Sequence, residues 1–300
     1  MPSLSILKSK FLEWIHERRI SDLAVIQNGQ ILSMTNSQLK SNNLQDFEFR
    51  VFSQWGEDGI IQKLTNILDF PNKTFIEFGV ENFLESNCRF LMMKDNWSGF
   101  VIDGSSKNIN QIEKSSFFWK FDLQAKAAFI TSENINSLLN ESGFEKDLGI
   151  LSIDIDGVDY WILEAIDHYE PRILILEYNA VFGQDRAITV PNDPSFNRTA
   201  KHFSNLYFGA SFSALRELAS AKGYTFVGTN SSGGNAFFIR TNLLNQELKE
   251  FAVSASFTDS KFRESRDSKG QLTYARGTSR LELIKGLPVV NTKTGMEEAI

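Results

Sequence analysis

The sequence predicts an α/β fold, a Rossmann-like, mostly parallel seven-stranded sheet with helices on both faces and an antiparallel closing hairpin. Two observations support this prediction. Short, continuously apolar segments alternate with helical ones from residue 47 to 242, as expected for strands that are covered on both faces. Only the stretch NSSGG (230–234) separates the last two apolar segments, so these form a hairpin and one strand must run antiparallel.

The elements follow in a regular order along this middle region. Helical segments at 85–94 and 159–166 can serve as right-handed crossovers between parallel strands, and a further helix is expected at 211–223. Five parallel strands followed by a helix and a closing hairpin is the strand pattern of the class I methyltransferase fold. The predicted strands are 74–78, 99–103, 117–121, 149–154, 172–177, 224–228 and 235–240.

Three regions are expected from composition. Residues 1–46 begin with an amphipathic helix, Leu4–Ile26, and continue through a polar turn and linker at 27–43. Residues 47–242 form the α/β domain, and residues 243–300 a loop-rich appendage packed on it. The apolar stripe of the first helix should be buried on the domain or in a homodimer, with peripheral association with the inner membrane as the weaker alternative.

Charge and composition exclude several classes of protein. The formal net charge of −6 argues against nucleic-acid binding, which needs a clustered basic face. The single cysteine, Cys88, excludes a disulfide framework and a cysteine-based zinc site. The beginning of the chain does not resemble a signal peptide, and no apolar run is long enough to span a membrane. We therefore expect a soluble, cytoplasmic protein.

The residues that follow the predicted strands indicate a ligand site, because ligands of such sheets bind outside the carboxyl ends of the strands. No GxGxxG motif follows the first strand, so a cofactor without a pyrophosphate is favoured. After the second strand, Asp103 could accept hydrogen bonds from two ribose hydroxyls, although it could also be a helix N-cap. Gly79 allows close approach of a ligand or is a simple turn glycine. The cofactor-binding candidates are Gln54, Glu77, Gly79, Ser86, Asn87, Asp103 and, for adenine, Asp122 at the end of the third strand.

Carboxylates are crowded after the fourth and fifth strands, in SIDIDGVDYW and ILEYNAVFG. Oxygen ligands from Asp154, Glu177 and Asn179 suit a hard cation such as Mg²⁺. Such a cation would lower the pKa of a bound hydroxyl, and Asp156 or Asp154 would serve as the catalytic carboxylate that takes the proton. The alternatives are a tight turn at Asp156 and a helix N-terminal acid after it.

A long polar insertion, residues 182–208, follows the fifth strand. Loops of this length inside a compact domain are usually functional, so we predict a substrate lid. His202 is a second candidate for the catalytic base, or else a solvated loop histidine. The residues expected to contact the acceptor are Tyr178, Arg186 and Tyr207.

Taken together, the motifs SQWGEDGII, FIEFGV with ESN, GFVIDGS, LSIDIDGVDYW, LEYNAVFG and FRESRDSKGQLTY resemble a bacterial family of S-adenosylmethionine-dependent methyltransferases. This family is FkbM-related and is associated with surface-polysaccharide (O-antigen and capsule) biosynthesis. The resemblance implies S-adenosyl-L-methionine as the methyl donor, bound by Glu77, Gly79 and Asp103. It also implies an Asp-x-Asp after the fourth strand, matched by Asp154 and Asp156. The second and third glycines of the family's strand-one motif are Glu81 and Phe83 here.

The sequence thus predicts an O-methyltransferase that acts on the hydroxyl of a sugar or glycan. One alternative is a Rossmann-like binding module without turnover, which the missing glycines would favour. The other is an oxidoreductase that modifies nucleotide sugars, which the missing GxGxxG disfavours.

Overall fold

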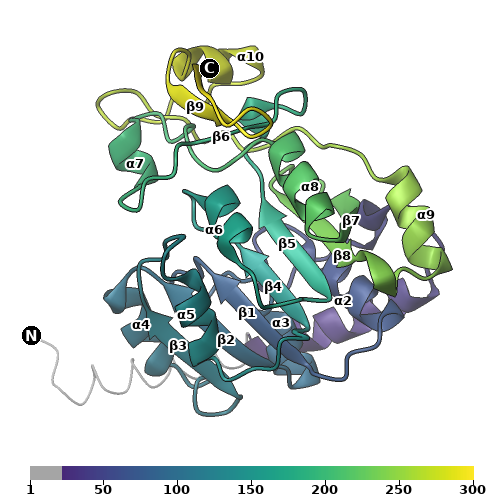
Figure 1. Ribbon diagram of the computed structural model, residues 1–300. Coiled ribbons are helices and arrows are strands. Elements are labelled where there is room, and N and C mark those ends of the chain that lie inside the picture. The colour runs from purple at the N-terminus through teal and green to yellow at the C-terminus, as the bar shows by residue number, and fades with distance from the viewer. Residues whose placement is uncertain (1–21) are drawn as a thin grey trace, which may run out of the picture.

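A seven-stranded sheet lies at the centre of residues 22–300, the part of the chain that the computed structural model describes (Figure 1). The strand order is β3-β2-β1-β4-β5-β8-β7; β1 to β5 are parallel, and β8 runs antiparallel to both β5 and β7. This confirms the Rossmann-like class I methyltransferase fold. The strands are β1 (Thr74–Phe78), β2 (Ser98–Asp103), β3 (Leu123–Ala127), β4 (Ile150–Ile153), β5 (Ile173–Glu177), β7 (Tyr224–Thr229) and β8 (Asn235–Arg240).

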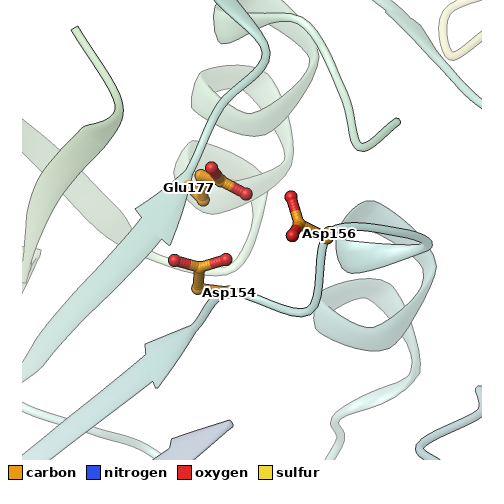
Figure 2. A group of neighbouring side chains, drawn as sticks. All are labelled: Asp154, Asp156 and Glu177. Atoms are coloured by element: carbon orange, nitrogen blue, oxygen red, sulfur yellow. The ribbon is translucent and has the colours of Figure 1, made fainter. Parts of the chain in front are cut away.

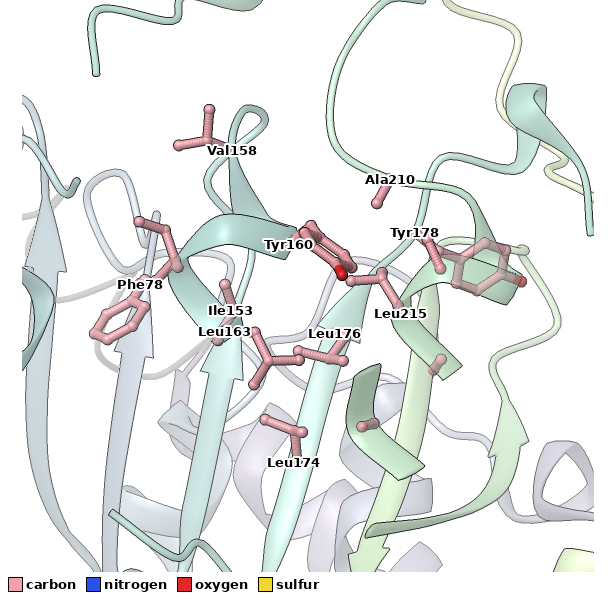
Figure 3. Packing of buried hydrophobic residues seen from close by; sticks show 14 of the residues in the cluster. Phe78, Ile153, Val158, Tyr160, Leu163, Leu174, Leu176, Tyr178, Ala210 and Leu215 are labelled. Atoms are coloured by element: carbon pink, nitrogen blue, oxygen red, sulfur yellow. The ribbon is translucent and has the colours of Figure 1, made fainter. Parts of the chain in front are cut away.

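Helices cover both faces of this sheet, because neighbouring residues of a strand point to opposite sides. On one face, Phe78, Ile153 and Leu176 belong to the apolar cluster that includes Leu163 of α6 and Leu215 of α8; Figure 3 labels these side chains. On the other face, Phe75 belongs to the apolar cluster that includes residues of α2, α3 and α4. The helices are α2 (Glu57–Ile67), α3 (Arg89–Asp95), α4 (Ser106–Glu113), α5 (Ile135–Glu141), α6 (Asp159–Ala165) and α8 (Phe212–Ala221), with 3-10 turns η1 (Leu44–Phe47), η2 (Ala180–Phe182) and η3 (Thr241–Leu243).

The third strand lies later in the chain than the sequence predicted. Residues 117–121 are a turn, and β3 begins at Leu123. Phe117 of this segment does pack inward, with its ring centroid 5.8 Å from that of Phe83, whereas Trp119 is 71% exposed. The strand itself lies at an edge of the sheet and is half exposed, so it lacks the continuous apolar pattern of the central strands.

The polar segment expected to be a turn and linker is largely helical, since residues 22–38 form one helix. It packs closely on the domain: a Cβ on Gly29 would lie 2.6 Å from Val51 and 2.7 Å from Phe90. Ser33 donates a hydrogen bond of 3.0 Å to Gln62 on α2. The polar residues therefore belong to a surface helix, whereas residues 1–21, with most of the predicted amphipathic stripe, lie outside the described part.

The C-terminal region packs on the α/β domain and contributes buried side chains to its apolar core. Helix α9 (Gln246–Ser254) packs on β7 and buries Leu248 and Phe251 in the apolar cluster of α2. Further on, β9 (Pro288–Asn291) pairs with both β10 (Glu297–Ala299) and β6 (Ile188–Thr189) of the long insertion. The insertion also contains α7 (Arg198–Lys201), and α10 (Thr278–Leu283) precedes β9. No helix within residues 22–300 is long and apolar enough to cross a membrane.

Replacing Phe251 by alanine should destabilise the whole domain. The side chain is fully buried and lies edge-on to Phe47, with ring centroids 5.8 Å apart. We expect a loss of about 3–5 kcal/mol in the free energy of unfolding, measured by chemical denaturation. Val253→Ala on the same helix is the control, because Val253 is 88% exposed and should change little. A similar small effect of both substitutions would show that α9 is not part of the folded core.

Candidate active site

A cavity of about 650 Å³ opens at the carboxyl ends of the parallel strands. Its wall is formed by the segments that follow β1 to β5, by part of the insertion and by the C-terminal region. It includes most of the candidates from the sequence: Gln54, Glu77, Gly79, Ser86, Asn87, Asp103, Asp154, Asp156, Glu177, Tyr178 and Asn179. The fold therefore brings these residues together, although some of the side chains hold loops in place and others are available to a ligand.

Glu77 holds the loop that follows β1. Its carboxylate accepts hydrogen bonds from the Ser86 hydroxyl at 2.6 Å and from the backbone amides of Asn87 at 2.7 Å and Cys88 at 3.2 Å. Burial raises the pKa of Glu77, while these hydrogen bonds act in the opposite direction. Asn87 in turn donates to Ser152 on β4 at 3.1 Å. These side chains are engaged with one another, so they shape the cavity wall and fix its loop.

The same loop depends on left-handed backbone conformations. Gly79 has φ +71°, and a Cβ there would lie 1.6 Å from the Asp154 carbonyl oxygen, so only glycine fits. Glu81 and Phe83 have φ of 46° and 62°, at the positions where the resembled family has glycines. The loop thus retains a glycine-like path without the glycines, at a cost of about 1–2 kcal/mol for each residue.

Asp103 at the end of β2 is a buried carboxylate on the cavity wall. It accepts hydrogen bonds from the backbone amides of Glu81 and Ser105, both at 2.8 Å, and from the Asn108 side chain at 3.1 Å. Each carboxylate oxygen can accept more than one hydrogen bond, so these contacts orient Asp103 and leave it able to receive a ligand. Because the helix α4 cap is Ser105, the alternative interpretation of Asp103 as N-cap is wrong.

Asp122 does not reach this cavity. It precedes β3 and therefore lies at the amino-terminal edge of the sheet, where its carbonyl accepts a hydrogen bond from Gly99 at 2.8 Å. The prediction that it contacts adenine is wrong, because the third strand was placed too early. The residues that do follow β3 on the cavity wall are Ala128, Phe129 and Ile130, and the Phe129 side chain is 52% exposed.

Three carboxylates meet at the ends of β4 and β5, those of Asp154, Asp156 and Glu177 (Figure 2). One oxygen from each lies within 4.8 Å of the others. Burial, and to a smaller extent the negative charges of Asp156 and Asp159, raise the pKa of Asp154 to about 8. Burial and the charge of Asp154 also raise the pKa of Glu177 well above its usual range. The arrangement is thus a concentrated negative charge that favours a cation or a proton.

Two neighbouring polar residues have structural tasks instead. Asp159 accepts hydrogen bonds from the amides of Ile155 at 2.9 Å and Gly157 at 3.0 Å, which agrees with its interpretation as a helix N-terminal acid. Asn179 donates to the carbonyls of Leu206 and Phe208, both at 2.9 Å, and accepts from Val181 at 3.0 Å. Both side-chain N–H groups are used and Oδ1 accepts one hydrogen bond, so Asn179 is held by the insertion, and its role as a metal ligand stays a prediction. Asp156, which we expected outside the ligand set, is the third carboxylate of the cluster.

The insertion contributes to the cavity through residues other than the predicted ones. Arg186 pairs with Glu298 at 2.6 Å, and the Tyr207 hydroxyl donates to the Pro288 carbonyl at 2.5 Å, so both hold the C-terminal region. The His202 Nδ1 lies 2.7 Å from the Ser204 hydroxyl, and burial lowers the pKa of its ring. None of these three lines the cavity, so the structure contradicts their assignment to acceptor binding or to the catalytic base. Tyr178 does line it, but its hydroxyl donates to the Thr258 carbonyl at 2.7 Å.

The residue that the sequence did not reveal is Arg198, the first residue of α7. It lines the cavity and pairs with the Asp156 carboxylate. No motif connects Arg198 to the acids that follow β4, so no sequence signal indicated its place in the site. Phe262, Glu264 and Arg280 of the C-terminal region also line the cavity; the first two lie at the start of the motif FRESRDSKGQLTY, to which the sequence assigns no role in the site.

No protein-family model matches the chain, and no curated protein matches it. Among solved structures, the N-terminal domain of EvdMO1 with SAH bound is similar over 72% of this chain and 94% of that chain, at 10% identity and a TM-score of 0.40. A Staphylococcus aureus protein named for caffeoyl-CoA O-methyltransferase is similar over 78% and 99%, at 16% identity and 0.42. The CurJ carbon methyltransferase is similar over 62% and 52%, at 12% identity and 0.39. At these values the function has to be argued from the residues of this chain.

The raised pKa of Asp154 makes stability depend on pH. In the folded protein the Asp154 carboxyl keeps its proton up to about pH 8, whereas in the unfolded chain it loses the proton at about pH 4. Unfolding therefore releases a proton between these values, and the free energy of unfolding falls as pH rises. We expect a decline from pH 6.5 to 8 in thermal or chemical unfolding with EDTA present, above the pKa of about 6 of the buried Asp58 and Asp159.

Asp154→Asn should make this decline less steep and raise the unfolding midpoint at pH 8; the decline that remains comes from Glu177, whose pKa burial also raises. Asp193→Asn is the control, because the Lys201 and Ser195 hydrogen bonds lower the pKa of Asp193 and it does not titrate in this window. An unchanged slope in Asp154→Asn would contradict the assignment of this proton.

Proposed function

We propose that this protein is an S-adenosylmethionine-dependent O-methyltransferase that acts on a sugar hydroxyl in surface-polysaccharide (O-antigen) biosynthesis. The observation that carries the proposal is a single cavity with two different ends. Asp103 and Phe129 lie at the ends of β2 and β3, and the carboxylate cluster lies at the ends of β4 and β5. A nucleoside-type donor suits the first end, and activation of a hydroxyl suits the second.

Donor binding would rest on Asp103 and Phe129. The Asp103 carboxylate is held in place by backbone amides, so it can accept hydrogen bonds from both ribose hydroxyls without reorganising. The exposed ring of Phe129 offers an apolar surface for the adenine. No pyrophosphate cradle follows β1, which favours a donor without one over a dinucleotide.

The carboxylate cluster would hold a divalent cation. Three carboxylates with oxygens within 4.8 Å are a donor set for a hard cation, and the guanidinium of Arg198 already balances part of their charge. When bound, such a cation would lower the pKa of an acceptor hydroxyl. The fit of the site therefore supports Asp154, Asp156 and Glu177 as its ligands.

Asp156 is the proposed proton acceptor. Its side chain is 49% exposed, and its Oδ2 has no hydrogen-bond partner among the described residues. Asp154 and Glu177 are more deeply placed, at the floor of the cavity, where burial raises the pKa of both and a cation would balance their charge. Methyl transfer is a displacement at the sulfonium methyl, so alignment of donor and hydroxyl across one cavity would supply much of the rate.

Two alternatives from the sequence remain to be separated by binding. A binding module without turnover would bind the donor but show no methyl transfer, and an oxidoreductase would bind NAD instead. The carboxylate cluster favours an enzyme over the binding module, because carboxylates this close together repel one another unless a cation or a proton lies among them.

Asp103→Asn should weaken S-adenosylmethionine binding. The ribose hydroxyls would lose a charged acceptor, which is worth about 1.5–3 kcal/mol, or roughly 10- to 100-fold in the dissociation constant. The dissociation constant of S-adenosylmethionine is measured by isothermal titration calorimetry. Asp122→Asn is the control, because Asp122 lies at the opposite edge of the sheet and should leave the affinity unchanged. Equal losses in the two variants, or none in either, would remove Asp103 from the donor site.

Methyl transfer to the acceptor should stop in EDTA and return with Mg²⁺ or Mn²⁺. Asp154→Asn and Glu177→Gln should abolish it while leaving donor affinity nearly unchanged, since neither carboxylate contacts the ribose end. Mass spectrometry of surface glycans with and without the gene identifies the acceptor through the missing methyl ether. Full activity in the chelator would exclude the cation and leave the carboxylates alone.

A further inference from the structure

Arg198 is the cation of the cavity wall that reaches the carboxylate cluster. Its Nη1 pairs with the Asp156 carboxylate. The other arginine on the wall, Arg280, pairs with Asp259 at 2.9 Å, outside the cluster. Within the described part of the chain, the cluster therefore draws its one ion pair from Arg198.

The guanidinium is held in this place by two further contacts. Its Nε donates to the Asn205 carbonyl at 2.7 Å, and its central carbon lies 4.0 Å from the centroid of the Phe208 ring. Both partners belong to the insertion, and the Arg198 side chain is only 21% exposed. Arg198 is thus a fixed charge that the insertion presents to the ends of β4 and β5, rather than a mobile surface residue.

This charge has opposite effects on the cluster and on a second cation. It stabilises Asp156 in the absence of another positive charge, because carboxylates so close together repel one another. It also repels a divalent cation that approaches the same oxygens, and its hydrogen bond occupies Oδ1 of Asp156. Among the described residues, Oδ2 of Asp156 stays open, but two positive charges at the same carboxylate repel each other, so the guanidinium and the cation compete.

We propose that Arg198 is the resident counter-cation of the carboxylate cluster and that a divalent cation binds there by displacing its guanidinium from Asp156. The inference rests on the proposed function, which assigns a cation to this cluster. Arg198 begins α7, and its neighbours Phe196 and Asn197 also line the cavity. Displacement of the guanidinium therefore changes the insertion side of the cavity, which links cation binding to the shape of the acceptor end.

The test is calorimetric titration of MgCl₂ and MnCl₂ into the full-length protein and its variants. Arg198→Gln should bind either cation roughly tenfold more tightly or better, because a charge-assisted hydrogen bond no longer has to be broken. Arg198→Met, which keeps an apolar stem against Phe208, should behave in the same way. Arg198→Lys keeps the positive charge and should stay within a few-fold of the wild type.

Lys201→Gln is the matched control. It removes the same charge from the same short helix, but Lys201 pairs with Asp193 at 2.5 Å, so cation affinity should not change. Weaker or unchanged cation binding in both folded Arg198→Gln and Arg198→Met would overturn the competition and leave the proposed function in place. Failure of both wild type and variants to bind a cation would overturn the cation role itself, whereas donor binding would still test the methyltransferase.

Discussion

The contact between Gly79 and the Asp154 carbonyl is the constraint on which the site depends. It joins the loop after β1 to the end of β4, so closely that a single Cβ would lie 1.6 Å from the oxygen. The β1 loop then positions Glu81, whose amide binds Asp103, while Asp154 begins the carboxylate cluster. This backbone contact, together with the pairing of β1 and β4 and the hydrogen bond from Asn87 to Ser152, therefore fixes the proposed donor and acceptor ends of the cavity relative to each other.

Acidic side chains have two distinct uses in this protein. Asp58 accepts hydrogen bonds from the amides of Val51, Phe52 and Ser53, and Glu77 and Asp159 hold loops in a similar way. Backbone amides compensate the burial of these carboxylates, which therefore stabilise tight loops near the strand ends. Asp154, Asp156 and Glu177 lack such amide partners in the described structure, and this difference separates candidate chemistry from scaffolding.

Prediction from sequence succeeded where the pattern is local and dense. The central strands β1, β2, β4 and β5 are apolar throughout and were located to within about a residue at either end. It failed at β3, an edge strand whose half-exposed residues lack a continuous apolar pattern. The turn before it is rich in aromatic residues, so the apolar pattern predicts the strand there instead. It also failed at residues 27–38, where a polar composition suggested a linker but the helix packs through Gly29 and Ser33.

The sequence by itself determined the fold class and the edge of the sheet where the site lies, because parallel strands end in acids that the chain order places side by side. It could not determine which polar side chains at this edge are already engaged in hydrogen bonds or ion pairs. The Asn179 side chain donates hydrogen bonds to two carbonyls of the insertion. Arg198 pairs with Asp156, from which it is separated by 42 positions in the sequence. Such pairings depend on how the insertion folds back over β4 and β5 and on its strand β6, which pairs with β9. Only the tertiary structure decides them, since no local pattern encodes a contact between distant segments.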